Sequence, residues 1–261
     1  ALAACGSSSS QGNDTSNKKL QTASTTSSSM QDNGSATDDS TVAQVGTFET
    51  RAPAKDVASS QSALFIAEGD KGVEVIKIGY HDRLDKELIT TIKGINASQV
   101  SLSEDQKKLY VTNRQGSVNE YDISDIHAPR HTRLLAPGTI RKHPVSQNGI
   151  YEYLPKQESG MVVYDISNPS HKERVSTFHE VPVYALALVD QDTKALAASG
   201  TKGVSLLDLA DHEHIHKVAS FPMEDKTLGI SINTKSGLLF VANGDKGIKV
   251  FNLNIFMDDL R

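Results

Sequence analysis

Residues 240–253, which read Phe-Val-Ala-Asn-Gly-Asp-Lys-Gly-Ile-Lys-Val-Phe-Asn-Leu, decide the fold, because shorter versions of this stretch recur through the chain. In most versions an apolar run leads through a polar turn to a glycine, after which a second apolar run begins. The glycines fall at positions 72, 116, 160, 203 and 247, so successive copies are 44, 44, 43 and 44 residues apart. A regular period of this kind is the signature of a repeat protein.

The period and the alternation of apolar residues predict four β-strands in each repeat, which is the unit of a β-propeller blade. The second repeat gives the template, with strands predicted at 98–102, 109–112, 118–123 and 133–135 and polar turns between them. We therefore predict an all-β fold with a single β-propeller over residues 44–261.

The two ends of the predicted propeller complement each other. The last repeat lacks a fourth strand, whereas residues 45–49 stand before the first repeat and resemble the fourth strands at 175–179 and 218–222. We expect this N-terminal strand to pair with the last repeat, which would remove exposed sheet edges. Four whole blades and one composite blade make five.

Two repeats resemble a family of bacterial propellers. Residues 162–169, Val-Val-Tyr-Asp-Ile-Ser-Asn-Pro, and residues 118–124, Val-Asn-Glu-Tyr-Asp-Ile-Ser, resemble the LVIVD repeat, and residues 109–113, Leu-Tyr-Val-Thr-Asn, resemble the related YVTN repeat. The resemblance covers residues 44–255 and implies a surface or periplasmic protein. Residues 205–209 keep only the Asp of the pattern, and residues 249–253 replace it with Asn.

The first residues resemble the lipobox of bacterial lipoproteins. The single cysteine, Cys5, follows Leu2-Ala3-Ala4 and precedes Gly6 and four serines. The resemblance implies that residues 1–5 are the remnant of a signal peptide with its lipobox, clipped in front, and that Cys5 carries a lipid anchor. Gly6 in the sorting position implies the outer membrane of a Gram-negative cell envelope.

Residues 6–43 have the composition of a flexible tether. They hold almost no Val, Ile, Leu or aromatic residues, so they cannot bury enough apolar surface to offset the entropy cost of ordering. A coil of this length spans roughly 30–35 Å. We therefore predict a disordered segment that holds the propeller clear of the membrane.

Charge and composition limit the partners. The chain carries a formal charge of −5, which gives no global attraction to nucleic acid. No stretch is long and apolar enough for a transmembrane helix. The absence of Trp argues against WD repeats, whose blades usually carry a Trp-Asp pair. We expect a monomer without a cofactor.

The loops that surround one end of a propeller channel supply the candidate binding residues. Those loops run from strand four to the next strand one and from strand two to strand three. They carry mixed charge with a basic excess, which suits an acidic protein patch or an anionic glycan, although a solvated rim is the alternative. The predicted binding face comprises Arg141, Lys142, His143, His179, Glu180, Asp225 and Lys226.

A cluster of histidines is a second candidate, although a weak one. If residues 212–216 were extended, His212, His214 and His216 would share one face and could bind zinc or copper. The matching segments of other repeats only connect strand three to strand four, which favours a plain connection. We predict no metal site.

Nothing in the sequence favours an enzyme. The predicted inner strands hold almost no acids, and there is neither a nucleophile elbow nor a phosphate loop. We therefore interpret the chain as a lipid-anchored binding platform of the cell envelope, not an enzyme. An envelope hydrolase that uses loop acids such as Glu180 and Asp225, and a structural surface-layer component, remain alternatives.

Overall fold

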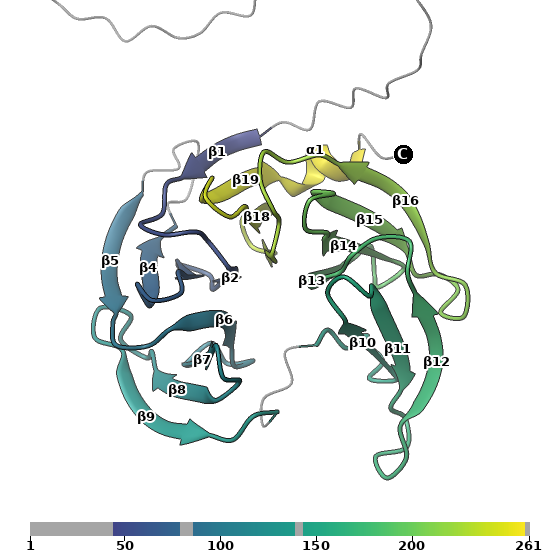
Figure 1. Ribbon diagram of the computed structural model, residues 1–261, viewed down its shortest axis with the longest axis horizontal. Coiled ribbons are helices and arrows are strands. Elements are labelled where there is room, and N and C mark those ends of the chain that lie inside the picture. The colour runs from purple at the N-terminus through teal and green to yellow at the C-terminus, as the bar shows by residue number, and fades with distance from the viewer. Residues whose placement is uncertain (1–43, 79–85, 139–142, 259–261) are drawn as a thin grey trace, which may run out of the picture. The chain divides into compact units, whose positions relative to one another are not determined.

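A computed structural model describes residues 44–78, 86–138 and 143–258, which form a ring of five β-sheets (Figure 1). The predicted tether and Cys5 lie outside these residues. In the described part, no helix is long and apolar enough to cross a membrane.

Each sheet is one blade, and the strands of a blade are ordered from the channel outward. Blade 1 contains β2 (Asp56–Ser59), β3 (Ala63–Ala67), β4 (Val73–Lys77) and β5 (Glu87–Ile92). Blade 2 contains β6 (Ala97–Leu102), β7 (Lys108–Asn113), β8 (Val118–Asp122) and β9 (Arg130–Leu135). Blade 3 contains β10 (Tyr151–Pro155), β11 (Met161–Asp165) and β12 (Glu173–Phe178). Blade 4 contains β13 (Ala185–Val189), β14 (Lys194–Ala198), β15 (Val204–Asp208) and β16 (His216–Phe221).

The fifth blade joins the two ends of the propeller, as predicted. It contains β17 (Gly229–Asn233), β18 (Leu238–Ala242), β19 (Ile248–Asn252) and, as its outermost strand, β1 (Gln44–Phe48). Strand β1 runs antiparallel to β19 with Phe48 opposite Ile248, and Phe48 is buried. A short helix, α1 (Leu253–Asp258), follows β19 and was not expected from the sequence.

The alternation of side chains along each strand explains how the blades pack. Successive residues point to opposite faces of a sheet, so each blade offers one set to each neighbour. In β3, Leu64 and Ile66 join an apolar cluster with blade 5, whereas Phe65 and Ala67 join a cluster with blade 2. Similar clusters seal blade 3 against blade 4 and blade 4 against blade 5.

The inner strand of blade 3 is shorter than the sequence suggested. Around Val145 and Ser146 the described residues form only an isolated bridge, between Val145 and Glu152, flanked by hydrogen bonds from Ser146 N to Tyr151 O and from Tyr153 N to Pro144 O. Blade 3 therefore has three full strands, with a fourth reduced to this bridge.

The repeat register in blade 2 also differs from the glycine spacing. The amide of Glu68 donates to the carbonyl of Gly72, but in blade 2 the amide of Asn113 donates to Ser117, one residue beyond Gly116. The Asn113 side chain also accepts from the amides of Gln115 and Ser117. The structural counterpart of Gly72 is thus Ser117, and this loop takes a different shape.

Candidate binding site at the channel mouth

Short backbone bridges bring the loops of neighbouring blades together at one end of the channel, which we call the mouth. Each bridge joins a loop between strands two and three to a residue at or just before the start of the inner strand of the next blade. The four described bridges pair Ala54 with Gly244, Gly69 with Ala97, Gln157 with Val183, and Gly200 with Thr227. Both sets of loops therefore surround the same end of the channel.

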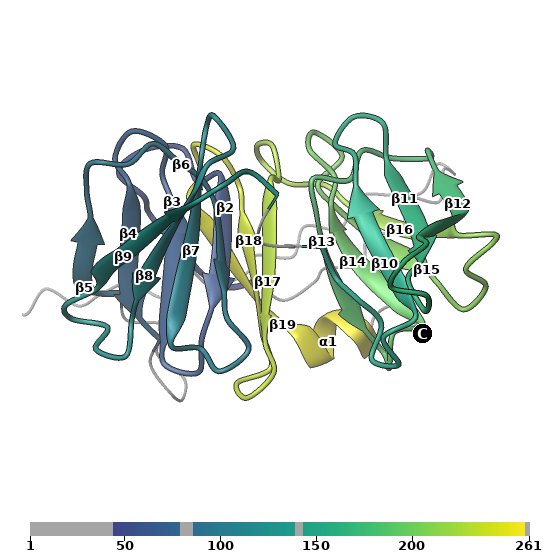
Figure 2. The ribbon, with the colours of Figure 1, turned by 90° about the horizontal axis from the view of Figure 1, so that it is seen from below.

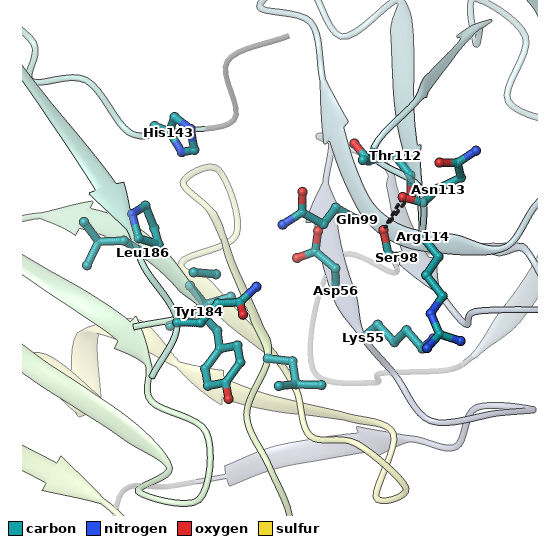
Figure 3. Close-up of a pocket in the computed structure, with 16 residues that line it drawn as sticks. Lys55, Asp56, Ser98, Gln99, Thr112, Asn113, Arg114, His143, Tyr184 and Leu186 are labelled. Atoms are coloured by element: carbon teal, nitrogen blue, oxygen red, sulfur yellow. Dashed lines mark hydrogen bonds between the residues drawn. The ribbon is translucent and has the colours of Figure 1, made fainter. Parts of the chain in front are cut away.

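A cavity of about 560 Å³ lies at the mouth (Figure 3). All five blades contribute to its lining, which comprises Lys55, Asp56, Ser98, Gln99, Thr112, Asn113, Arg114, Gly116, His143, Pro155, Gln157, Tyr184, Ala185, Leu186, Leu228 and Ile230. Figure 3 shows His143, Tyr184 and Leu186 on one side of the cavity, and Lys55, Gln99 and Arg114 on the other. A space of this size suits a few side chains of a partner.

Two basic side chains of the lining lack an acidic partner. Lys55 and Arg114 extend toward each other in Figure 3, and within the described ranges neither forms an ion pair. The Lys55 ammonium lies over the bridge between blades 1 and 2, since a Cβ added to Gly69 would come 2.8 Å from its nitrogen. Neighbouring like charges without a counterion favour the binding of an anion.

The acid in the lining has a structural role. Asp56 is 3% exposed, and its carboxylate accepts a hydrogen bond of 2.8 Å from the amide of Val100 in β6. It also fills the space beside Gly229, where an added Cβ would meet Asp56 Oδ1 at 2.5 Å. Asp56 is the first residue of β2, so it is an exception to the expectation that the inner strands hold almost no acids.

Tyr184 adds a neutral hydrogen-bonding group. Its hydroxyl donates to the Glu158 carboxylate, and this bond, together with burial, raises the pKa of Tyr184 to about 12. Tyr184 therefore keeps its proton throughout the physiological range, and it presents an aromatic face to the cavity beside Leu186.

The predicted binding face is only partly gathered around this cavity. His143 lines it, whereas Arg141 and Lys142 lie outside the described residues. Asp225 accepts hydrogen bonds from the amides of Lys226 at 2.7 Å and Asp245 at 2.8 Å, and these bonds lower its pKa. Asp225 thus fixes two mouth loops to each other, and neither it nor Lys226 lines the cavity.

His179 and Glu180 belong to a mouth loop, but both are held away from the cavity. The imidazole of His179 lies 2.9 Å from the carbonyl of Ser159 in the same blade. Glu180 accepts a hydrogen bond of 3.3 Å from the amide of Lys217 in the outer strand β16. The carboxylates of Glu180 and Asp225 therefore do not converge at the channel, which an enzyme that uses both would require.

The histidine cluster does not form the shared face that an extended segment would give. The chain turns at residues 211–214, where His214 pairs with Asp211 at 2.9 Å. His212 lies 3.2 Å from the Tyr153 hydroxyl, and its ring centre lies 3.9 Å from that of Tyr151 with the rings tilted by 39°, so it packs blade 4 against blade 3. The described residues contain no group of three or more acids, histidines or cysteines placed to hold a metal ion.

The comparisons with known proteins identify the fold. No protein-family model matches the chain, and no curated protein matches it in sequence. The chain is similar to one in a solved structure described as "Crystal Structure of Mitotic Checkpoint Complex", at 10% identity and a TM-score of 0.58, over 89% of this chain and 98% of that chain. The chain is a five-bladed β-propeller.

A second similar propeller is described as "Crystal structure of RRP9 WD40 repeats". It shares 8% identity and a TM-score of 0.56, over 79% of this chain and 96% of that chain. At these low identities, the two likenesses show a shared β-propeller fold.

Proposed function

We propose that this propeller is a binding module that captures an acidic protein segment at the mouth of its channel. The observation that carries the proposal is the placement of Lys55 and Arg114 in the lining of one cavity, without an ion pair among the described residues. The acid beside them, Asp56, is buried and bound to the amide of Val100, so it does not neutralise them by direct contact.

The electrostatics of the mouth support an anionic partner despite the net charge of the chain. A concave site with low-dielectric walls focuses the field of the charges that line it, so the local potential matters more than the total of −5. Exposed charges act mainly on the association rate, and salt screens them with a Debye length of about 8 Å at physiological ionic strength. Capture should therefore weaken as salt is added.

The structural comparisons are compatible with this role. One similar chain belongs to a checkpoint complex, which is an assembly of proteins, and the other consists of WD40 repeats. The described residues offer a cavity with hydrogen-bonding groups and two cations, while the carboxylates of Glu180 and Asp225 are bound elsewhere. This arrangement favours recognition over catalysis.

We further propose that the propeller works in the bacterial cell envelope as a lipoprotein of the LVIVD type. Support comes from the lipobox-like sequence before Cys5, the Ser-rich residues that follow it, and the repeats at 118–124 and 162–169. With a complete signal peptide, the protein should partition with membranes and incorporate labelled palmitate, whereas Cys5→Ser should not. Equal labelling of both would reject the anchor.

The mouth is tested with a fluorescein-labelled peptide of twelve residues in which Glu and Ser alternate. Binding to the 261-residue chain is followed by fluorescence anisotropy between 50 and 300 mM salt, which spans weak to strong screening. We expect Lys55→Glu with Arg114→Glu to weaken binding at least tenfold. The matched control, Lys107→Glu with Lys235→Glu, reverses two charges in turns at the opposite end and should change binding less than twofold. Equal losses in both pairs would reject recognition at the mouth.

A glycan and self-association are separate outcomes. If a sulfated oligosaccharide competes with the peptide while the unsulfated sugar does not, the mouth recognises anions of either source. If instead the wild-type chain forms assemblies in light scattering and binds neither probe, the surface-layer alternative is favoured and the proposal fails.

A further inference from the structure

Four side chains of the cavity lining hold the same place in four different blades. In each of these blades, a residue at or just before the start of the inner strand takes part in a mouth bridge, and the residue after it lines the cavity. These lining residues are Lys55 in blade 1, Ser98 in blade 2, Tyr184 in blade 4 and Leu228 in blade 5. The repeat therefore offers one position that can be compared around the mouth.

This position is polar on one side of the mouth and apolar on the other. Blades 1 and 2 hold the lysine and the serine, whereas blades 4 and 5 hold the tyrosine and the leucine. The inner strands of these blades follow one another around the channel, since β17 contacts both β13 and β2, and β2 contacts β6. Figure 2 shows β17 between β13 and β2. The two polar residues are therefore adjacent, and so are the two apolar ones.

With two further residues of the lining, these side chains form two walls of the cavity. The polar wall comprises Lys55, Ser98 and Arg114, and the apolar wall comprises Tyr184, Leu186 and Leu228. Figure 3 shows Tyr184 and Leu186 across the cavity from Lys55 and Arg114. The cavity thus places apolar side chains opposite two cations.

The backbone and the neighbouring loops hold the apolar wall in place. The amide of Tyr184 donates to the carbonyl of Ala198 at 2.9 Å, and the amide of Leu228 donates to that of Ala242 at 3.0 Å. The Tyr184 ring lies over Gly200, where an added Cβ would meet its Cε2 atom at 2.8 Å, and its hydroxyl is bound to Glu158. A wall fixed in this way loses little conformational entropy when a partner binds.

The apolar wall is the edge of the core that reaches the cavity. Leu186 belongs to the cluster between blades 3 and 4, and Tyr184 packs against the cluster between blades 4 and 5. Tyr184 and Leu228 are nevertheless only partly buried. Covering such apolar surface with an apolar group of a partner is favourable, and binding cavities commonly combine apolar surface with a few placed polar groups.

Two facing walls suit an extended segment. Successive side chains of an extended chain point in opposite directions. An acidic residue can therefore face Lys55 and Arg114 while the residue next to it faces the apolar wall. A segment with acids alone leaves the apolar wall uncovered.

We propose that the mouth selects acidic segments in which a large apolar residue stands next to an acid, with the acid on the polar wall and the apolar side chain against Tyr184, Leu186 and Leu228. This inference rests on the proposed function, since it names the class of segment that the same cavity takes. The cations attract the segment, and the apolar wall distinguishes one acidic segment from another.

The test compares two labelled peptides of equal charge, both blocked at their ends. One is the alternating Glu-Ser peptide, and the other has Leu in place of one central Ser. The wild-type chain should bind the Leu peptide about tenfold more tightly, as partial burial of a leucine side chain provides. Salt screens charges but not apolar contacts, so between 50 and 300 mM salt both affinities should fall while their ratio stays within about twofold.

A third peptide tests whether the two walls face each other across an extended segment. It has Leu in place of one central Glu, so the leucine points to the same side as the remaining acids. Compared with a peptide that has Ser at that place, it should gain less than about threefold in affinity. Equal gains from Leu at the Ser position and at the Glu position would overturn the inference.

Two substitutions locate the preference on the apolar wall. Leu228→Ser should lower the ratio of the two affinities from about ten to below about three. The control Leu134→Ser removes a leucine that is 64% exposed on the outer strand β9 and should leave the ratio near ten. If Leu228→Ser does not fold, Leu228→Lys gives blade 5 the residue that blade 1 holds at this position. It should also lower the ratio below about three and should strengthen binding of the Glu-Ser peptide. An unchanged ratio in the folded variant would contradict the inference.

The variant with reversed charges separates this inference from the proposed function. If the wild-type chain binds both peptides equally well and Lys55→Glu with Arg114→Glu weakens both, the apolar wall plays no part and the inference fails, whereas recognition of acidic segments at the mouth stands. If reversing the two charges weakens neither peptide, the proposed function fails as well.

Discussion

The carbonyl oxygen of Phe178 lies 2.0 Å from the point where a Cβ on Gly160 would stand. Phe178 is the last residue of the outer strand β12. Its backbone therefore lies against the mouth loop of the same blade. The same approach recurs between Ile92 and Gly72 and between Phe221 and Gly203. Only a glycine admits it, because any side chain would displace the backbone of the outer strand.

This geometry predicts a large difference between two glycines that look equivalent in the sequence. Gly160→Ala should destabilise the propeller by more than the roughly 1–2 kcal/mol that a left-handed conformation costs, because the added Cβ also meets Phe178. Gly116→Ala should cost only about 1–2 kcal/mol, because its Cβ would meet nothing closer than Pro137 at 3.8 Å. Urea unfolding of both variants checks this. Equal losses would contradict the altered loop of blade 2.

The same pair of glycines separates features that the sequence predicts from a feature that it does not. The period, the strand order and the closure by β1 were predictable, because each follows from a local pattern of apolar residues that repeats. The one-residue shift at Gly116 was not, because the Asn113 side chain replaces the glycine in shaping that loop.

The cavity depended on side-chain direction, which spacing alone does not give. Lys55 and Asp56 are adjacent in sequence, and only the pairing of β2 places both at the mouth.

Closure of the ring by β1 predicts a strong effect of one aromatic residue. Phe48 is 2% exposed and packs in the cluster that joins blades 5 and 1. Phe48→Ala should lower the free energy of unfolding by about 3–5 kcal/mol. Val45 in the same strand is 51% exposed, so Val45→Ala should change it by less than about 0.5 kcal/mol. Similar melting temperatures for the two variants would contradict the composite blade.

The turn after β15 predicts a stability change with pH. Burial lowers the pKa of His212 below its ordinary value of 6.5, although Asp211 and Asp192 oppose this. The unfolded chain therefore binds the proton more readily than the folded chain. The contribution of His212 is fully present above about pH 6.5 and is lost as the pH falls through the folded-state pKa. His212→Gln should make the melting temperature less sensitive to pH between 5 and 7.

His214 in the same turn should act in the opposite direction. Its hydrogen bond to Asp211 raises its pKa, so its contribution is present below about pH 6.5 and is lost as the pH rises through the folded-state pKa. His214→Gln should therefore make the loss of stability on acidification steeper. The two variants together check the sign, and a shift of both slopes in one direction would contradict the assignment.

Asp56 separates the structural role of an acid at the mouth from a role in recognition. Its carboxylate accepts the amide of Val100, which is 1% exposed, so Asp56→Ala would leave a buried donor unsatisfied and should cost about 1–3 kcal/mol of stability. Asp56→Asn keeps an acceptor oxygen for that amide but removes a negative charge from a cavity lined by Lys55 and Arg114. We expect it to preserve the melting temperature within a few degrees and to raise affinity for the Glu-Ser peptide several-fold, with a stronger salt dependence. If Asp56→Asn abolished peptide binding while remaining folded, the carboxylate itself would be a recognition group, and the attraction of acidic segments to the mouth would have to be abandoned.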